Sequence, residues 1–208
     1  MNELKKFGII PIDFSTLTNA FVHYKFPKDK VSSLEKSGKL IRLKKGMFVV
    51  SANIHDQTLS KELIANHLYG PSYISFESAL SFYSLIPERV HIMRSMTTKR
   101  ARNFSSPLGD FEYVSSKNEY FQIGIHQEII DNKYAYLIAS PEKALCDLIV
   151  ATPWLRIQSV KAMQTYLDEN LRLDFVDIEN FDLEIIKQCI AVGKKKNELT
   201  QLYKLLKQ

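Results

Sequence analysis

Hydrophobic positions near the start of the chain predict two helices in succession. In the first, expected over residues 13–24, apolar side chains recur at i, i+3, i+7 and i+10, namely Phe14, Leu17, Phe21 and Tyr24. In the second, which starts at Pro27, Val31 and Leu34 share one face. Gly38 suits the position just after its end, because glycine tolerates a left-handed backbone. The two apolar faces are therefore expected to pack against each other.

The polarity pattern then changes from helical to extended. Leu40, Ile41 and Leu43 lead into Lys44-Lys45-Gly46, and residues 47–50 are again apolar. Residues 26–50 therefore predict a helix followed by a hairpin with a basic tip. Two helices followed by a hairpin are typical of winged helix-turn-helix domains, in which the second helix enters a DNA major groove and the hairpin, or wing, lies along phosphates.

Short apolar runs separated by polar turns follow in the middle of the chain. They predict strands over residues 90–97, 101–104, 111–115, 121–129 and 134–138. Turns of this kind favour a largely antiparallel sheet.

Helical patterns flank this region on both sides. Residues 59–69 and 75–83 predict two helices, with His67 packed in the core and Ser75 as a cap. Ser140-Pro141-Glu142 is a favourable helix start, and further helices are expected at about 155–168, 182–192 and 195–206. We therefore predict an α+β protein with two domains. The predicted domains are a winged helix-turn-helix over residues 1–55 and a mixed, largely antiparallel sheet domain with C-terminal helices over residues 56–208. Residues 51–57 are expected to be a polar linker at their boundary. The helices within 58–87 fit either domain.

The charge is unevenly distributed along the chain. Residues 1–50 contain ten Lys and Arg against four Asp and Glu, whereas the whole chain has a net charge of only +5. This asymmetry favours an anionic partner for the N-terminal domain over the alternative of lysines that are merely solvated. Residues 166–184 are acidic and residues 185–208 basic, a combination that suggests a surface facing another protein.

The remaining composition is that of an ordinary globular protein. Cys146 and Cys189 lie in apolar helical patterns and are expected to be buried free thiols, as in a reducing compartment. The first residues lack the apolar core of a signal peptide, and no apolar run is long enough to span a membrane. We therefore expect a cytoplasmic protein.

Signatures of catalysis, nucleotide binding and metal binding are not found in the sequence, so neither an enzyme nor a cofactor or metal is expected. One remote alternative is a metal-dependent nuclease, with Asp110, Glu112, Glu142 and Lys143 as its site.

Several stretches together resemble the AbiEi-type antitoxins and transcriptional regulators of bacterial type IV toxin–antitoxin systems, which act in abortive infection. In order along the chain they are residues 38–49 (GKLIRLKKGMFV), 73–80 (YISFESAL), 85–88 (LIPE), 97–100 (TTKR), 107–113 (PLGDFEY) and 139–148 (ASPEKALCDL). The resemblance covers about residues 26–150.

This resemblance implies a non-enzymatic repressor that binds inverted repeats in its own promoter. It also implies a C-terminal domain that counteracts a nucleotidyltransferase toxin without forming a stable complex. By position, DNA contacts fall on Lys28, Lys30, Ser32, Ser33, Lys36, Arg42, Lys44 and Lys45. We expect the antitoxin surface on a basic strip of Arg89, Arg94, Lys99, Arg100 and Arg102, unless that strip is only a solvated strand face. A stand-alone winged-helix regulator with a ligand- or protein-sensing C-terminal domain remains the alternative.

Overall fold

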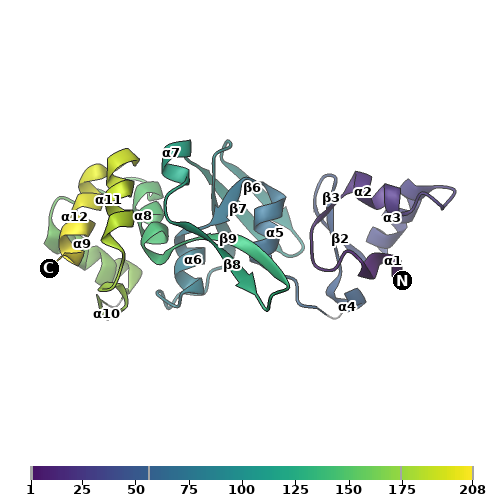
Figure 1. Ribbon diagram of the computed structural model, residues 1–208, viewed down its shortest axis with the longest axis horizontal. Helices are drawn as coiled ribbons and strands as arrows, with labels where there is room; N and C mark the ends of the chain where they lie inside the picture. The colour runs from purple at the N-terminus through teal and green to yellow at the C-terminus, as the bar shows by residue number, and fades with distance from the viewer. Residues whose placement is uncertain (1, 56, 174, 208) are drawn as a thin grey trace.

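The computed structural model describes residues 2–55, 57–173 and 175–207. Figure 1 shows an N-terminal unit at one end, a sheet in the middle and a group of helices at the other end, with the two termini far apart. The predicted α+β class is confirmed. In the described ranges no helix has both the length and the apolar character needed to cross a bilayer.

Residues 2–50 of the N-terminal unit form three helices and a small antiparallel sheet with the strand order β1-β3-β2. Its elements are α1 (Asn2–Lys5), β1 (Ile12–Asp13), α2 (Phe14–Ala20), α3 (Pro27–Lys36), β2 (Leu40–Lys44) and β3 (Met47–Val50). Both predicted helices therefore exist, although α2 ends four residues before Tyr24, which is exposed.

Local chemistry explains where these helices begin and end. The carboxylate of Asp13 accepts a hydrogen bond from the Thr16 backbone N–H at 2.8 Å and caps α2. At the end of α3, Gly38 adopts the predicted left-handed conformation with φ +69°. Its N–H bonds to the Glu35 carbonyl, and the chain can then turn directly into β2.

The β2–β3 hairpin contributes to two separate hydrophobic cores. On one face, Leu40, Phe48 and Val50 pack with α2 and α3 in the core of the N-terminal unit. On the other face, Leu43 and Val49, 1% and 0% exposed, belong to the core of the central sheet. The alternation of strand side chains thus places one hairpin between the two halves of the protein.

The central sheet is mixed, with the strand order β6-β7-β5-β4-β9-β8. The β7–β5 and β4–β9 pairs are parallel and the other three pairs are antiparallel. Its strands are β4 (Ser72–Ile74), β5 (Ile92–Thr97), β6 (Arg102–Ser106), β7 (Gly109–Ser115), β8 (Ile125–Ile130) and β9 (Tyr134–Ala139). Strand β4 was not expected from the sequence. It has only three residues, too few to show a pattern in the sequence. Nearby, the Asn66 side chain of the helix over Lys61–Leu68 bonds to the backbone N–H and C=O of Leu137 in β9.

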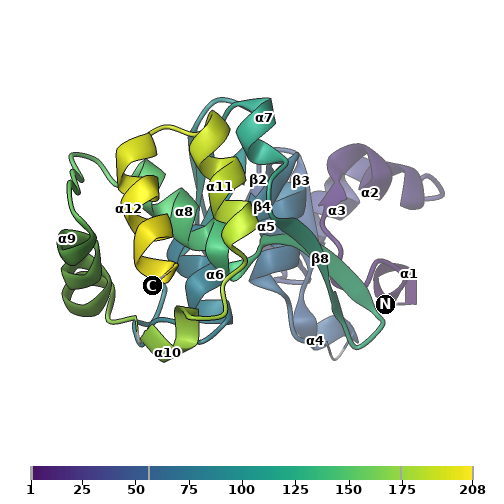
Figure 2. The ribbon, with the colours of Figure 1, turned by 60° about the vertical axis from the view of Figure 1, so that its left-hand side comes forward.

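Helices cover this sheet, and further helices follow it towards the C-terminus (Figure 2). They are α5 (Lys61–Leu68), α6 (Phe76–Phe82), α7 (Asn118–Phe121), α8 (Pro141–Ala151), α9 (Val160–Thr165), the π-helical turn η1 (Tyr166–Leu171), α10 (Phe175–Ile178), α11 (Leu183–Val192) and α12 (Lys196–Leu206). The short helix α4 (Ala52–His55) packs instead near α1, and its Ile54 belongs to the core of the N-terminal unit. Ser140 caps α8 as predicted, by accepting from the Lys143 N–H.

Several local predictions are wrong. Residues 51–57 are not a plain linker, because α4 forms within them; residue 56 lies outside the described residues. The strand expected from residue 121 starts at Ile125, because α7 and a left-handed Gly124 precede it. His67 is exposed rather than packed in the core, and partial burial still lowers its pKa.

A fully buried ion pair lies where the sheet meets α8. The Lys143 Nζ is 2.8 Å from the Asp147 Oδ1, and both side chains are 0% exposed. Asp147 Oδ2 also accepts hydrogen bonds from the Tyr73 hydroxyl at 3.0 Å and the Ser75 hydroxyl at 2.6 Å. Lys143 donates to the Tyr120 carbonyl. The Ser75 side chain therefore belongs to this cluster. The sequence predicted that it would cap α6, and that prediction is wrong, because the side chain forms no hydrogen bond at the start of α6.

Candidate nucleic-acid interface

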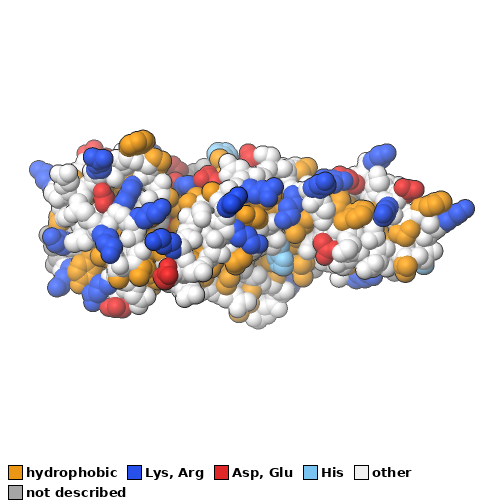
Figure 3. Space-filling model, turned by 90° about the horizontal axis from the view of Figure 1, so that it is seen from above, with side chains coloured by type: hydrophobic (Ala, Val, Ile, Leu, Met, Phe, Trp, Pro, Cys, Tyr) orange, Lys and Arg blue, Asp and Glu red, His pale blue; other side chains and the backbone are white. Residues whose placement is uncertain are grey.

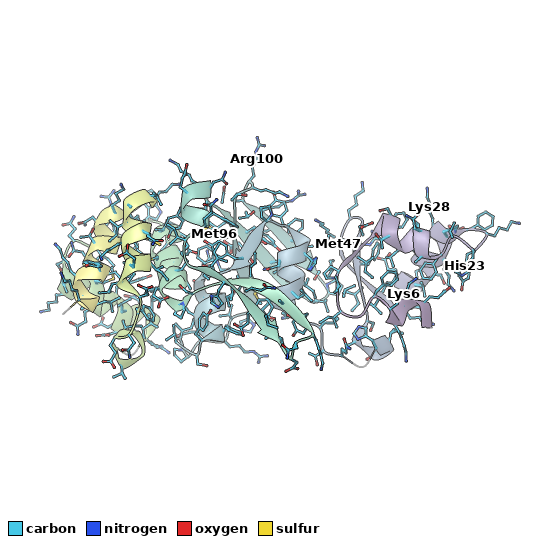
Figure 4. All side chains as sticks on the ribbon, in the orientation of Figure 1. Lys6, His23, Lys28, Met47, Met96 and Arg100 are labelled. Atoms are coloured by element: carbon cyan, nitrogen blue, oxygen red, sulfur yellow. The ribbon has the colours of Figure 1, made fainter. Side chains whose placement is uncertain are left out.

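The outer face of α3 carries polar and cationic side chains at helical spacing. Lys28, Ser32 and Lys36 are separated by four residues each, so they lie along one stripe, and all three are exposed. Figure 4 shows Lys28 projecting from α3 into solvent. Opposite this stripe, Val31 and Leu34 are buried, which fixes the rotation of the helix about its axis.

The remaining predicted residues of α3 differ in their surroundings. Ser33 is exposed beside the stripe, whereas Lys30 is half-buried and places its Nζ 4.6 Å from the Tyr24 ring centroid. Lys30 thus has an aromatic partner within the protein, while Lys28 and Lys36 form no ion pair among the described residues.

Arg42 is held by an acidic partner on α3. Its Nε donates to the Glu35 Oε1 at 2.7 Å, and its guanidinium lies 4.7 Å from the Phe48 ring centroid. The hydrogen bond with Glu35 raises the pKa of Arg42 and lowers the pKa of Glu35. Arg42 therefore joins α3 to the hairpin, which reduces its availability for a phosphate.

Lys44 and Lys45 are neighbours with different environments. Lys44 is half-buried and donates to the Leu68 carbonyl at the end of α5. Burial lowers the pKa of Lys44, and repulsion from the nearby cations Arg102 and Lys99 lowers it further. Lys45 is exposed at the hairpin tip beside Gly46, whose φ of +80° allows the tight turn.

A cluster that we name the basic platform continues this surface onto the central sheet. It comprises Lys44, Lys99 and Arg102 together with the rings of Tyr69 and Phe104. Lys44 and Arg102 lie 5.5 Å and 5.0 Å from the Phe104 centroid, and Lys99 lies 5.3 Å from that of Tyr69. The two rings contact each other at 5.6 Å.

Figure 3 looks down on the side from which Lys28 and Arg100 project in Figure 4. Lys and Arg side chains form a band there, from the N-terminal unit across the middle of the molecule. Arg100 is exposed in the turn between β5 and β6, next to Lys99. The hairpin tip, the platform and the outer face of α3 thus contribute to one basic side of the protein.

The structure divides the predicted basic strip into three parts. Lys99, Arg100 and Arg102 stay together near the hairpin. Arg94 is only 21% exposed, pairs with Glu77 at 2.6 Å and Glu112 at 3.3 Å, and stacks on Phe76, so it supports the sheet. Arg89 lies instead in the segment between α6 and β5, in a hollow lined also by Lys61, Glu62 and Phe82.

Three of the four residues of the remote nuclease alternative, Asp110 being the exception, are shown with other partners. Glu142 accepts a hydrogen bond from the Asp182 N–H, Lys143 pairs with Asp147, and Glu112 pairs with Arg94. Among the described residues, no three His, Cys, Asp or Glu side chains gather closely enough to hold a metal ion.

The aromatic part of the platform was missed at the sequence level. Tyr69 ends α5 and Phe104 lies in β6, and no spacing in the sequence connects them. The contact of β2 with β6 brings Lys44 to the Phe104 ring, which in turn contacts the Tyr69 ring. The alternation of Arg102 and Phe104 was a signal, because residues two apart in a strand share one face.

No model of a known protein family matches this chain, and no curated protein sequence matches it. The DNA-binding part of the functional proposal therefore rests on its own residues and their geometry.

Proposed function

We propose that the protein binds double-stranded DNA through a winged helix-turn-helix and acts as an AbiEi-type repressor and antitoxin. One observation supports the DNA-binding half above all. The exposed stripe Lys28, Ser32 and Lys36 lies on a helix that packs against a β2–β3 hairpin with an exposed lysine at its tip. A helix with such a stripe fits the major groove, and a basic hairpin tip fits the flanking phosphates.

The individual side chains would divide the work by their chemistry. Lys28, Lys36 and Lys45 are flexible cations suited to phosphates, which position a protein without reading sequence. Ser32 and Ser33 are short and can donate to or accept from base edges. Because few side chains would read bases, the specificity of each half-site is expected to be modest.

The basic platform extends the proposed DNA interface beyond the N-terminal unit. Lys99, Arg100 and Arg102 lie beside Lys44 rather than with Arg89 and Arg94, so we now assign these three to the DNA interface instead of an antitoxin surface. A duplex that crosses α3 and the hairpin tip would then continue along the central sheet.

The test is a binding titration by fluorescence anisotropy, using the DNA upstream of the protein's own coding region at several salt concentrations. In Lys28→Ala/Lys36→Ala the affinity should fall, and the slope of log K against log salt should become shallower by about 2, since each phosphate contact contributes about 0.9. The matched control, Lys204→Ala/Lys207→Ala, removes two exposed lysines at the end of the chain far from α3 (Figure 1) and should leave the slope unchanged.

Equal slopes for wild type and both variants would refute the assignment of α3. A variant Lys99→Ala/Arg100→Ala tests the platform in the same titration, and an unchanged slope would confine the interface to the N-terminal unit.

The antitoxin half is supported only by the sequence resemblance and has its own test. If a nucleotidyltransferase encoded beside this protein arrests growth, co-expression of the full chain should relieve the arrest. Relief should persist in Lys28→Ala/Lys36→Ala when both proteins are expressed from foreign promoters. Continued arrest with well-expressed wild-type protein would contradict the antitoxin role and leave a stand-alone regulator.

A further inference from the structure

A second surface feature lies away from the DNA interface, between the central sheet and the C-terminal helices. It is a pocket of about 520 Å³, a volume typical of small-molecule sites. Its walls come from the ends of β5 and β7, the Ser116-Lys117 turn, α7 and the C-terminal ends of α8 and α11. Figure 4 shows Met96, one of its wall residues, where the sheet meets these helices. We call it the sheet–helix pocket.

The inner wall of this pocket is largely apolar. Met96, Val114, Val150 and Ala151 contribute to it, together with Val192, which is 44% exposed and thus incompletely covered by the protein. Tyr120 also lines the pocket, although only 4% of this residue is exposed.

The rim of the pocket is basic. Lys117 and Lys194 are exposed and line it, and no Asp or Glu is among the described lining residues. The C-terminal end of α8 would ordinarily attract a cation through its free carbonyls. Here the Lys195 ammonium already bonds to the carbonyls of Ile149, at 3.1 Å, and Thr152. The charge around the opening therefore favours an anion.

We infer that the sheet–helix pocket binds a small molecule with an apolar body and one anionic group, and that this molecule regulates DNA binding. The apolar body would cover Val192 and Ala151, while the anionic group, a carboxylate, sulfonate or phosphate, would lie between Lys117 and Lys194. The regulatory part rests on the proposed function; the binding part does not.

A short hydrogen-bonded path connects the pocket to the basic platform. The N–H of Ser116, in the pocket wall, donates to the Thr97 carbonyl at 2.8 Å. The hydroxyl of buried Thr97 accepts from the Lys99 N–H at 3.2 Å. A ligand that shifts the Ser116-Lys117 turn thereby acts on the start of the turn carrying Lys99 and Arg100. Its negative charge also reduces the positive potential there, so the bound ligand lowers DNA affinity.

The probe is 8-anilinonaphthalene-1-sulfonate, which has an apolar body, one sulfonate and fluorescence that rises in apolar sites. Wild-type protein should bind it at one saturable site. In Lys117→Glu/Lys194→Glu, binding should weaken by about tenfold or more, because two attractive charges become repulsive. The variant Ala151→Trp fills the pocket without changing its charge and should also abolish saturable binding. The uncharged analogue N-phenyl-1-naphthylamine should bind more weakly than the sulfonate.

The matched control is Lys204→Glu/Lys207→Glu, an equal charge change on exposed lysines that do not line the pocket. It should bind the probe within about twofold of wild type. The midpoint of urea unfolding is measured for every protein in the comparison. Equal midpoints show that differences in fluorescence do not come from probe binding to partly unfolded protein. An equal loss in the control, or wild-type binding in both pocket variants, would overturn the site.

The regulatory part is measured by repeating the DNA titration with saturating probe. Weaker DNA binding in wild type, but not in Lys117→Glu/Lys194→Glu, supports regulation from the pocket. Probe binding without any change in DNA affinity overturns the regulation but not the site. If the protein bound no DNA at all, the proposed function would fail while the probe titration still tested the pocket.

Discussion

The buried ion pair of Lys143 and Asp147 makes a large change in stability predictable. In Asp147→Ala the Lys143 ammonium stays buried without its counter-ion, and the Tyr73 and Ser75 hydroxyls lose their shared acceptor. At 2.8 Å and an effective dielectric of about 20, the attraction between the two charges is ~6 kcal/mol. Part of it remains in the variant through the Tyr120 carbonyl and through the Tyr120 ring, whose centroid is 3.2 Å from Nζ.

We therefore expect Asp147→Ala to lower the free energy of unfolding by about 4 kcal/mol, within the range measured when one partner of a buried pair is removed. For a chain of this length the melting temperature should fall by about 8–16 °C. The assay is urea unfolding followed by circular dichroism at 222 nm, together with a thermal scan.

Two comparisons make this prediction specific. The double variant Lys143→Met/Asp147→Leu removes both charges, so it should be less destabilised than Asp147→Ala. Its total loss relative to wild type should be about 2 kcal/mol, because the Tyr73 and Ser75 hydroxyls are left without an acceptor. The control Glu184→Ala breaks an exposed ion pair in α11 with Lys187 at 3.0 Å, and no measurable change is expected. A loss below about 1 kcal/mol in Asp147→Ala would refute the reasoning, as would a double variant less stable than the single one.

Three further outcomes are expected from urea unfolding. Asp13→Ala should lower the free energy of unfolding by about 1 kcal/mol through loss of the α2 cap. Hydrogen bonds from Ser15 and Thr16 lower the pKa of Asp13 to about 2, so this contribution is present above pH 4 and is lost as the pH falls towards 2. If the stability of wild type and variant fell equally between pH 4 and pH 2, the reasoning would be contradicted. Gly124→Ala should destabilise more than Gly38→Ala: both glycines have positive φ, but a Cβ at Gly124 would lie 2.9 Å from a side-chain atom of Lys143, whereas Gly38 faces open space. Leu43→Ala should lower stability by about 3 kcal/mol because the side chain is 1% exposed, and a loss below 1 kcal/mol would show that the hairpin packs loosely on the sheet.

Elements governed by neighbouring residues were predictable from the sequence. Ser140 followed by Pro141 starts α8, and Gly38 ends α3, because caps depend on side chains only a few residues away. Ser75 has the same cap chemistry, yet its hydroxyl bonds to Asp147, 72 residues further along the chain. A partner so distant leaves no local pattern, and β4, which precedes Ser75, is likewise too short to have one.

The candidate interface shows the same division. The exposed stripe on α3 follows from helical periodicity, since Val31 and Leu34 point inward and Lys28, Ser32 and Lys36 therefore point outward. Whether a basic side chain is available for a ligand depends on contacts that only folding creates. Glu35 engages Arg42, and the Leu68 carbonyl engages Lys44.

The position of the β2–β3 hairpin between two cores limits how this chain can be divided. A fragment ending at residue 55 would expose Leu43 and Val49 to water, and a fragment starting at residue 56 would expose the apolar surface that these side chains cover. Each fragment would be prone to aggregate through that surface. Substitutions in the full-length chain, rather than truncations, are therefore the sound way to assign separate roles to its two halves.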